Sequence, residues 1–476
     1  MNLKHSRTKI VATIGPACSS NEALRGMIME GVDVFRLNFS HSKHEEHLRV
    51  MEIIRSLNKE LQTNVAILAD LQGPKLRIGE VENNAVQLEE GKEVVFNTEA
   101  EFIGDSARLY MSYKEFPRDV AKGDVILIDD GKIRLEALES DGKANVRARV
   151  INGGMLSSKK GVNLPHTKVS LPSLTEKDIR DAHFALDNDV DWLALSFVRS
   201  ASDILDLREL MKQKKKHAGI IAKIEKPEAL LQIDNIIDVA NGIMVARGDL
   251  GVEVPYDRVP MIQKEIASKC IARGKPVIIA TQMMESMITN FRPTRAEATD
   301  VANAVMDGAD ALMLSGETSV GKYPVDVISA MQRIIDYTEQ HGFVYNREHA
   351  PHEMARNFFP DSICANACIM ASQTNASAIA LFTFSGYTAF RISSHRPQAH
   401  IFAFTRSEAL MRKLSLAWGV RAFYYDKSDN IDEAITDTTS LLKDNKLINE
   451  EEVIIHVGST PINARGQTNL IKLGYV

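Results

Sequence analysis

The sequence is poor in cysteine and tryptophan, with four and two residues among 476, and aromatic residues make up 6% of it. Four cysteines in so long a chain do not form a disulfide framework, so cross-links are not expected to hold the fold. Cys364 and Cys368 lie one helical turn apart, but no second pair of metal ligands lies nearby in sequence. We therefore expect both to pack in a core rather than bind a metal.

Two further absences limit location and partners. The chain has no apolar run near the roughly 20 residues of a membrane span, and residues 1–5 lack the apolar core of a signal peptide. Lys and Arg number 57 against 63 Asp and Glu, a net charge of −6, whereas nucleic-acid binding usually goes with a basic excess. We expect a cytoplasmic protein that binds neither membranes nor nucleic acids.

The repeating pattern of the chain predicts its fold class. Short apolar or β-branched runs alternate with helix-like segments, which is typical of parallel strands joined by crossover helices. The runs span residues 9–15, 33–40, 65–71, 191–197, 219–225, 242–248, 276–282 and 309–316. Eight such units predict an α/β fold, a (β/α)8 TIM barrel, over residues 1–73 and 167–345.

The connection after the third run is about a hundred residues long, and its sequence pattern is that of short strands joined by turns. Residues 126–135 (ILIDDGKIRL) predict a hairpin, because Asp-Gly accepts the positive φ angles of a type I′ turn. We predict a small all-β lid domain, residues 74–166, inserted after strand 3 at the end of the barrel where such enzymes keep their sites. A domain without a functional role is the alternative.

The strand and helix pattern restarts after a polar stretch at 347–356. Strands are predicted at 378–384, 400–405, 420–425 and 452–458, with helices beginning at Asp361 and Ile431. This pattern indicates a C-terminal open α/β domain, residues 346–476.

Polar residues gather at the carboxyl ends of the predicted barrel strands, where barrel enzymes carry their chemistry. They are Arg36, Asn38, Ser40, Asp70, Lys223, Glu225, Arg247, Gly248, Asp249, Thr281, Ser315 and Glu317. Glu225 and Asp249 supply the carboxylate oxygens that Mg²⁺ or Mn²⁺ prefers. Lys223, two residues before Glu225, lies on the same face of the strand, and a salt bridge without a catalytic role is the alternative.

Additional cations favour phosphoryl transfer as the chemistry. Arg36, Arg77 and Lys159-Lys160 would surround the metal, and phosphoryl transfer depends mostly on positioning and charge stabilisation. Residues 316–323 nearly match a P-loop, but Tyr323 replaces the Ser or Thr that would bind Mg²⁺. No G-x-G-x-x-G follows a predicted strand, which argues against dinucleotide chemistry.

Several long motifs resemble those of the pyruvate kinase family, in the same order. They are TKIVATIGPA (8–17), RLNFSH (36–41), GPKLR (73–77), KKGVNLP (159–165), AKIEKP (222–227), MVARGDLGVEV (244–254), ATQMM (280–284) and RPTRAEATDV (292–301). The resemblance runs from about residue 6 through the barrel and lid, and more loosely through the third domain.

The resemblance implies transfer of the phosphoryl group of phosphoenolpyruvate to ADP, giving pyruvate and ATP, the last step of glycolysis. It implies that Glu225 and Asp249 bind Mg²⁺ and that Lys223 stabilises the transferred group. Arg36 would hold the substrate phosphate, and Gly248, Asp249 and Thr281 would bound the rest of the substrate, with Thr281 near the route of proton delivery. The residues expected to face the nucleotide are Asn38, Phe39, Ser40, His41, Arg77 and Lys160.

Departures from the family pattern predict independence from K⁺. Family members that need K⁺ resemble one another in carrying Glu in the motif G-P-E and Thr after the aspartate, whereas this chain has Lys75 and Leu71. A fixed ammonium can take the place of the monovalent cation. The monovalent site formed by Asn38, Ser40, Asp70 and Leu71 would then be replaced by Lys75. A surface ion pair of Lys75 is the alternative.

The stretch from Thr383 to Thr388 follows a predicted strand and opens a helix, where backbone N–H groups can hold phosphate. It resembles the effector loop of the family, so Thr383, Ser385, Gly386 and Thr388 are expected to bind a sugar phosphate or AMP. A plain turn capped by Ser385 and Thr388 is the alternative. The resemblance also suggests a homotetramer.

Two other function classes remain open at this stage. A Mg²⁺-dependent lyase or aldolase acting on an oxo acid would use the same Glu225 and Asp249, but it needs no second phosphate site such as Arg77 and the lid lysines would provide. The second class is a non-catalytic metabolite sensor. The presence of Lys223 and Thr281 argues against it.

Overall fold

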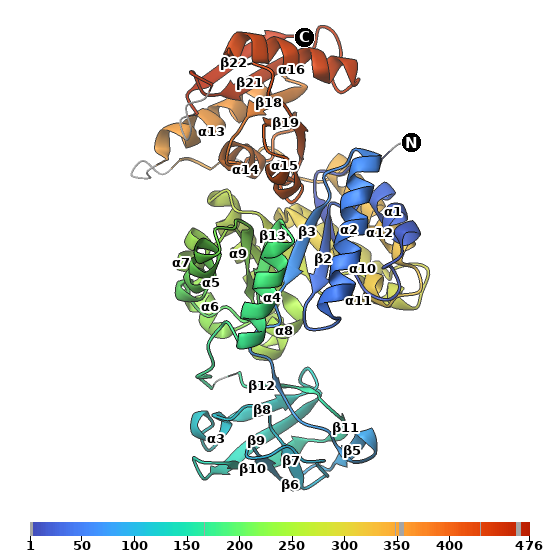
Figure 1. Ribbon diagram of the computed structural model, residues 1–476, viewed down its shortest axis with the longest axis vertical. Helices are drawn as coiled ribbons and strands as arrows, with labels where there is room; N and C mark the ends of the chain where they lie inside the picture. Colours follow the sequence, from blue (N-terminus) through green and yellow to red (C-terminus); the bar gives the residue numbers. More distant parts are fainter. Residues whose placement is uncertain (1–2, 166, 348, 352–356, 429, 463–467) are drawn as a thin grey trace.

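The computed structural model describes residues 3–165, 167–347, 349–351, 357–428, 430–462 and 468–476. Three bodies follow one another along its long axis, with the barrel in the middle and the β-rich lid and the C-terminal domain at opposite ends (Figure 1). No helix within these ranges has the length and apolar content that a membrane crossing requires.

Eight parallel strands close into a barrel in the order β1-β17-β16-β15-β14-β13-β3-β2, which confirms the predicted barrel. These strands are β1 (Lys9–Thr13), β2 (Val34–Asn38), β3 (Ala66–Asp70), β13 (Trp192–Leu195), β14 (Gly219–Ile224), β15 (Gly242–Ala246), β16 (Val277–Ala280) and β17 (Ala311–Leu314). Alternate side chains such as Val11, Leu68 and Met244 fill the interior, and the intervening ones pack under the helices. Burial on both faces explains why each strand reads as a continuous apolar run.

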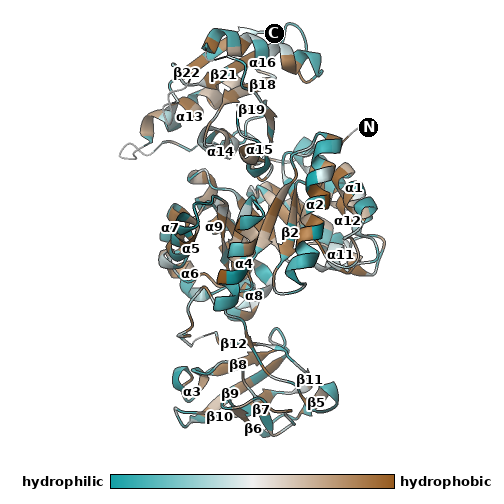
Figure 2. Ribbon diagram, viewed as in Figure 1, coloured by the Kyte–Doolittle hydropathy of each residue, from teal (hydrophilic) through white to brown (hydrophobic). Residues whose placement is uncertain are grey.

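Helices surround the barrel, and their polar faces lie outward in Figure 2. They are α1 (Asn21–Met29), α2 (His44–Leu61), α4 (Glu176–Asp187), α5 (Ala201–Gln213), α6 (Pro227–Leu231), α7 (Ile233–Val239), α8 (Arg247–Glu253), α9 (Val259–Ala272), α10 (Arg295–Asp307), α11 (Gly316–Ser319) and α12 (Pro324–His341). Thr175 and Thr294 form capping boxes with Asp178 and Glu297 at the starts of α4 and α10. These caps satisfy the first backbone N–H groups and fix where each helix begins.

The lid contains a seven-stranded sheet in the order β4-β12-β8-β9-β10-β6-β7 and a second sheet of β11 and β5. Its elements are β4 (Leu76–Arg77), β5 (Ala85–Leu88), β6 (Glu93–Asn97), β7 (Arg108–Tyr110), α3 (Phe116–Asp119), β8 (Val125–Ile128), β9 (Ile133–Ser140), β10 (Asn145–Asn152), β11 (Gly154–Ser157) and β12 (Gly161–Asn163). The predicted hairpin is β8–β9. Lys132 N donates to Asp129 O, and Asp130 and Gly131 between them both have positive φ, as a type I′ turn requires. The predicted lid boundary at residue 166 lies outside the described residues.

The C-terminal domain has a five-stranded sheet in the order β20-β19-β18-β21-β22. Its elements are α13 (Phe358–Gln373), β18 (Ala378–Phe382), α14 (Tyr387–Ser394), β19 (His400–Thr405), α15 (Glu408–Leu414), β20 (Val420–Tyr424), α16 (Ile431–Asp444), β21 (Val453–Gly458) and β22 (Leu470–Tyr475). The four predicted strands pair in parallel, and β22, which the sequence analysis missed, adds an antiparallel edge.

Aspartates at the amino-terminal ends of barrel strands bind the C-terminal domain. Asp310, just before β17, accepts the N–H of Val277 on the neighbouring strand and pairs with Arg396 at 3.1 Å. Asp191, just before β13, accepts the N–H of Ile67 and pairs with Arg412 at 2.8 Å. Both ion pairs join the base of the barrel to the C-terminal domain, away from the carboxyl ends of the strands.

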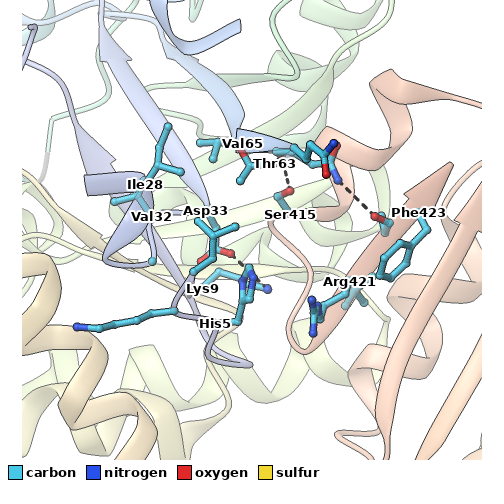
Figure 3. Close-up of a pocket in the computed structure, with 17 residues that line it drawn as sticks. His5, Lys9, Ile28, Val32, Asp33, Thr63, Val65, Ser415, Arg421 and Phe423 are labelled. Atoms are coloured by element: carbon cyan, nitrogen blue, oxygen red, sulfur yellow. Dashed lines mark hydrogen bonds and ion pairs between the residues drawn. The ribbon is translucent and has the colours of Figure 1, made fainter. Parts of the chain in front are cut away.

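The same boundary contains a cavity of about 170 Å³ (Figure 3). Lys9 and Asp33 line it from the barrel and form an ion pair of 3.3 Å, while Arg421 and Phe423 line it from β20. Burial, followed by the charges of Arg421 and Lys9, lowers the pKa of His5 to about 4. The barrel and the C-terminal domain therefore meet across a partly filled, cation-rich boundary.

Candidate active site

Strand ends bring the predicted charged residues together. Arg36 lies on β2, Asp70 ends β3, and Lys223 is the penultimate residue of β14, two residues before Glu225. Arg36 Nε contacts Asp70 Oδ2 at 2.6 Å, and Lys223 Nζ lies 3.2 Å from Asp70 Oδ1. Lys223 Nζ also lies 3.0 Å from Glu225 Oε1. Two cations and two carboxylates thus form one continuous buried network across the mouth of the barrel.

Two hydroxyl groups complete this network, and the sequence analysis did not select them. Lys223 donates to Ser196 Oγ at 2.8 Å, and Arg36 donates to Thr13 Oγ1 at 3.0 Å. Thr13 ends β1, and Ser196 directly follows β13. Both occupy the same strand-end position as the selected residues, so applying the strand-end rule to all eight strands would have found them.

Burial and charge act in opposite directions on the ionisation of this network. Burial opposes the charged form of Asp70, but Lys223 and Arg36 outweigh it and hold the pKa of Asp70 below its ordinary value. Burial also opposes the charge on Lys223, but Asp70 and Glu225 outweigh it and raise the pKa of Lys223. Lys223 therefore carries its positive charge throughout the neutral pH range.

The carboxylates Glu225 and Asp249 fit a divalent cation. Burial raises the pKa of Glu225. The charge of Lys223 lowers this pKa and the charge of Asp249 raises it, and the net result lies above the ordinary value. Glu225 Oε2 accepts the N–H of Phe197 at 2.7 Å, and the only close cation at the buried Oε1 among the described residues is the Lys223 ammonium, 3.0 Å away, which forms no hydrogen bond of regular geometry. Two carboxylates whose charges act on each other, as those of Glu225 and Asp249 do, supply the oxygen ligands that a divalent cation prefers. No cluster of three or more His, Cys, Asp or Glu ligands occurs in the described ranges.

Gly248 and Thr281 form the side of the site next to Asp249. Gly248 N donates to Thr281 Oγ1 at 2.7 Å, and the Thr281 hydroxyl donates to Ala280 O. Thr281 has φ 72°, a conformation that is costly for a β-branched residue. This conformation holds its hydroxyl at the Gly248 amide, beside the first turn of α8.

Lys75 reaches the barrel site from the segment that leads into the lid. Its Nζ lies 3.5 Å from Asp249 Oδ1, and both side chains are about one quarter exposed. Of the residues expected around a monovalent cation, Asn38 and Asp70 are partners in the pairing of β2 with β3, and Asn38 Oδ1 accepts the N–H of Ser40. Leu71 is buried. The lysine thus brings its charge to the carboxylate of Asp249.

The residues expected to face a nucleotide occupy different surroundings. The pKa of His41 is lowered, mainly by burial and then by the positive charges of Arg77, Arg36 and Lys75. These three cations therefore act on the same loop. The Phe39 ring is buried and stacks on His47. Its side chain is therefore part of the packing beneath the loop.

The lid lysines are held by lid carboxylates. Lys160 Nζ lies 2.7 Å from Asp129 Oδ1, and Lys159 Nζ lies 2.9 Å from Glu80 Oε1. Arg77 donates to the carbonyl of Lys159 at 3.0 Å. The structure therefore does not bring the lysine pair into contact with the barrel network.

A cleft of about 830 Å³ opens beside these groups. Lys75, Gly248, Asp249 and Gln282 line its inner part, and Asp130 of the lid hairpin lines it from the other side. Arg247 forms an ion pair with Asp300 at 2.8 Å along its wall. This volume lies within the range of small-molecule binding sites, roughly 300–1,000 Å³.

Ser315 and Glu317, also selected from the strand ends, have backbone partners. Glu317 is buried, and its two oxygens accept the N–H groups of Met284 and Ser315. The carboxylate joins the loops after β16 and β17, so it shapes the rim of the barrel.

The loop expected to bind an effector forms a tight turn before α14. Gly386 has φ 86° and donates its N–H to Thr383 Oγ1 at 3.0 Å, and Tyr387 N donates to Ser385 Oγ at 3.4 Å. Thr388 Oγ1 lies 2.8 Å from Thr468 Oγ1. The first two bonds lie within the turn, the third joins α14 to a distant segment, and Gly386 at the start of the helix receives no side-chain capping hydrogen bond.

The closed barrel, the inserted lid and the C-terminal α/β domain define a (β/α)8-barrel enzyme, and the fixed cations beside carboxylates at its strand ends suit phosphoryl transfer. Family models for the pyruvate kinase barrel domain and the pyruvate kinase alpha/beta domain match residues 5–328 and 361–473. The chain therefore belongs to the pyruvate kinase family.

Individual relatives agree over almost the full length. The chain is 43% identical to a pyruvate kinase of Agrobacterium vitis over 467 residues, covering 98% of both chains. It is 42% identical to a pyruvate kinase of Geobacillus stearothermophilus over 472 residues, 98% of this chain and 80% of the relative. A crystal structure of a pyruvate kinase from Cryptosporidium parvum superposes with a TM-score of 0.91 at 35% identity, covering 98% of this chain and 96% of the other.

Proposed function

We propose that this chain transfers the phosphoryl group of phosphoenolpyruvate to ADP, giving pyruvate and ATP, as the last step of glycolysis. The observation that carries the proposal is Lys223, which is buried between Asp70 and Glu225 at the mouth of the barrel. A charged ammonium fixed in a water-poor site stabilises the negative charge of a phosphoryl group in transfer more strongly than one in solution.

Each residue of the network has a proposed part in this reaction. Arg36, oriented by Asp70 and Thr13, binds the substrate phosphate, and Lys223 stabilises the group as it moves. Gly248, Asp249 and Thr281 bound the carboxylate and methylene side, where the enolate takes up a proton. The Thr281 hydroxyl, fixed by Gly248, is at hand for that proton transfer.

Mg²⁺, or Mn²⁺, is the proposed cofactor, held by Glu225 and Asp249 with the remaining positions filled by substrate oxygens and water. When bound, it would neutralise charge on the phosphate and the carboxylate of the substrate. Lys75 would supply, from within the chain, the monovalent charge that K⁺ provides elsewhere in the family. The activity is therefore proposed to be independent of K⁺.

The nucleotide is proposed to lie close to Asn38, Ser40, His41 and Arg77, none of which lines the cleft of about 830 Å³. Phe39 would shape the loop from below, and Lys160 would act only after its ion pair with Asp129 opens. In this proposal the barrel (1–73 and 167–345) is catalytic, residues 74–166 form the lid, and residues 346–476 are regulatory.

The remaining features of the proposal concern the protein in the cell. We propose a cytoplasmic homotetramer whose turn at Thr383, Ser385, Gly386 and Thr388 binds a sugar phosphate or AMP. The family resemblance and the position of the turn at the start of α14 support this assignment.

Pyruvate formation from phosphoenolpyruvate and ADP with Mg²⁺, measured with and without K⁺, tests the proposal, and Lys223→Met provides the control. We expect equal rates in both buffers and a loss of at least about a hundredfold in the variant. Pyruvate release without ADP would indicate a lyase instead, and no ADP-dependent pyruvate in either buffer would refute the transferase.

A further inference from the structure

A buried carboxylate outside the charge network joins the lid to the barrel. Glu253, at the end of α8, is 2% exposed. Its Oε1 accepts hydrogen bonds from Lys226 Nζ at 2.6 Å and from Asn163 Nδ2 at 2.8 Å. Its Oε2 is also buried and has no donor among the described residues. A buried carboxylate depends on the few donors it has, so these contacts hold the three side chains in one arrangement.

The three residues belong to three segments that each carry part of the candidate site. Lys226 directly follows Glu225, and Glu253 ends the helix that begins with Arg247, Gly248 and Asp249. Asn163 is the last residue of β12 in the lid. The carboxylate therefore connects both proposed metal-binding segments to the lid.

The lid strand β12 in turn contacts the two cationic residues at the entry to the lid: Lys75, which approaches Asp249, and Arg77. It pairs antiparallel with β4, with Gly161 opposite Arg77 and Val162 opposite Leu76. Gly161 also packs closely against Lys75, since a Cβ built on the glycine would lie 3.2 Å from Lys75 Cε. A shift of β12 relative to α8 would therefore move both Lys75 and Arg77 relative to Asp249.

We propose that Glu253 is a positioning residue for phosphoryl transfer, acting through Asn163 to set Lys75 opposite Asp249 and Arg77 within electrostatic reach of His41. This inference rests on the proposed function. It predicts a selective defect, because Arg36, Lys223 and Thr281 belong to the barrel and stay in place when the lid contact is lost. Binding of phosphoenolpyruvate should therefore be spared, while ADP binding and turnover should suffer.

Asn163→Ala tests the inference, since it removes the lid contact and leaves the Lys226–Glu253 pair intact. Asn97→Ala is the matched control. Asn97 is 8% exposed against 7% for Asn163, and it donates to Asn145 Oδ1 at 2.8 Å within the lid sheet. Steady-state rates are measured with ADP and phosphoenolpyruvate varied in turn, together with the melting temperature of each variant.

We expect Asn163→Ala to raise KM for ADP and lower kcat, each by about tenfold, because small displacements of reacting groups are costly in rate. KM for phosphoenolpyruvate should stay within about twofold, and Asn97→Ala should leave all constants near wild type. Equal kinetic constants in the two variants, with a similar fall in melting temperature, would refute the positioning role. Absence of ADP-dependent activity in the wild type would instead refute the proposed function.

A conservative pair of substitutions separates position from charge. In Lys226→Met/Glu253→Gln the buried charges are removed together, and the glutamine oxygen can still accept from Asn163. We expect KM for ADP within about threefold of wild type in this variant, and the full defect when Asn163→Ala is added. A full defect without Asn163→Ala would overturn the role of Asn163.

Discussion

Removing the charge of Lys75 should make the enzyme respond to K⁺. Lys75 Nζ lies 3.5 Å from Asp249 Oδ1. Two unit charges at this separation interact by about 5 kcal/mol at an effective dielectric constant of about 20. The side chains are 28% and 27% exposed, so screening by water lowers the expected effect to about 1–2 kcal/mol. Lys75→Met should therefore lower the K⁺-free rate by about fivefold to thirtyfold.

The assay compares kcat in Na⁺ buffer with and without K⁺ for the wild type, Lys75→Met and Lys75→Arg. The wild type and the arginine variant should respond little to K⁺, because both carry a positive charge at this position. The methionine variant should regain rate when K⁺ is added, since the cation can then approach Asp249, which has lost its ammonium partner. An unchanged K⁺-free rate in Lys75→Met, or strong K⁺ stimulation of the wild type, would refute the assignment of Lys75.

Two further predictions concern stability. Asp310→Asn should destabilise the attachment of the C-terminal domain by about 3–5 kcal/mol, because it leaves the fully buried Arg396 without its carboxylate partner. An unfolding curve equal to that of the wild type would contradict this prediction. Burial lowers the pKa of His395 from 6.5 to about 3 and that of His349 to about 4. The unfolded chain therefore takes up more protons than the folded chain as pH falls below about 6.5, and the free energy of unfolding should fall between about pH 6.5 and 4. Thermal unfolding at about pH 7 and about pH 5 should show this fall, and the fall should be smaller in His395→Gln. If stability depends on pH equally in that variant and in the wild type, His395 does not contribute to the effect.

The barrel could be predicted from sequence because its strands are buried on both faces, so each one reads as a continuous apolar run. The edge strand β22 (Leu470–Tyr475) was missed for the opposite reason. Its residues LIKLGY are intermediate or exposed and border the sheet on one side only. The run therefore carries neither a continuous apolar pattern nor a strict alternation, and only its pairing with β21 defines it.

The candidate site was predictable to the extent that it depends on strand ends. Arg36, Asp70, Lys223 and Glu225 meet because the carboxyl ends of neighbouring parallel strands meet at one mouth. The partners of the lid lysines were not predictable in this way. Lys160 meets Asp129 through the pairing of β12 with β8, a register between distant segments that no local pattern encodes.

The attachment of the C-terminal domain to the base of the barrel determines how far any signal from it must travel. Arg396 holds Asp310 at one end of β17, and Glu317 lies just beyond the other end. At about 3.3 Å per residue, the four residues of that strand span about 13 Å. Packed interiors have low compressibility and transmit strain. For a ligand of the C-terminal domain that shifts Arg396, this strand is therefore a direct path to the rim of the barrel, and substitutions that create cavities in the barrel interior should weaken the coupling.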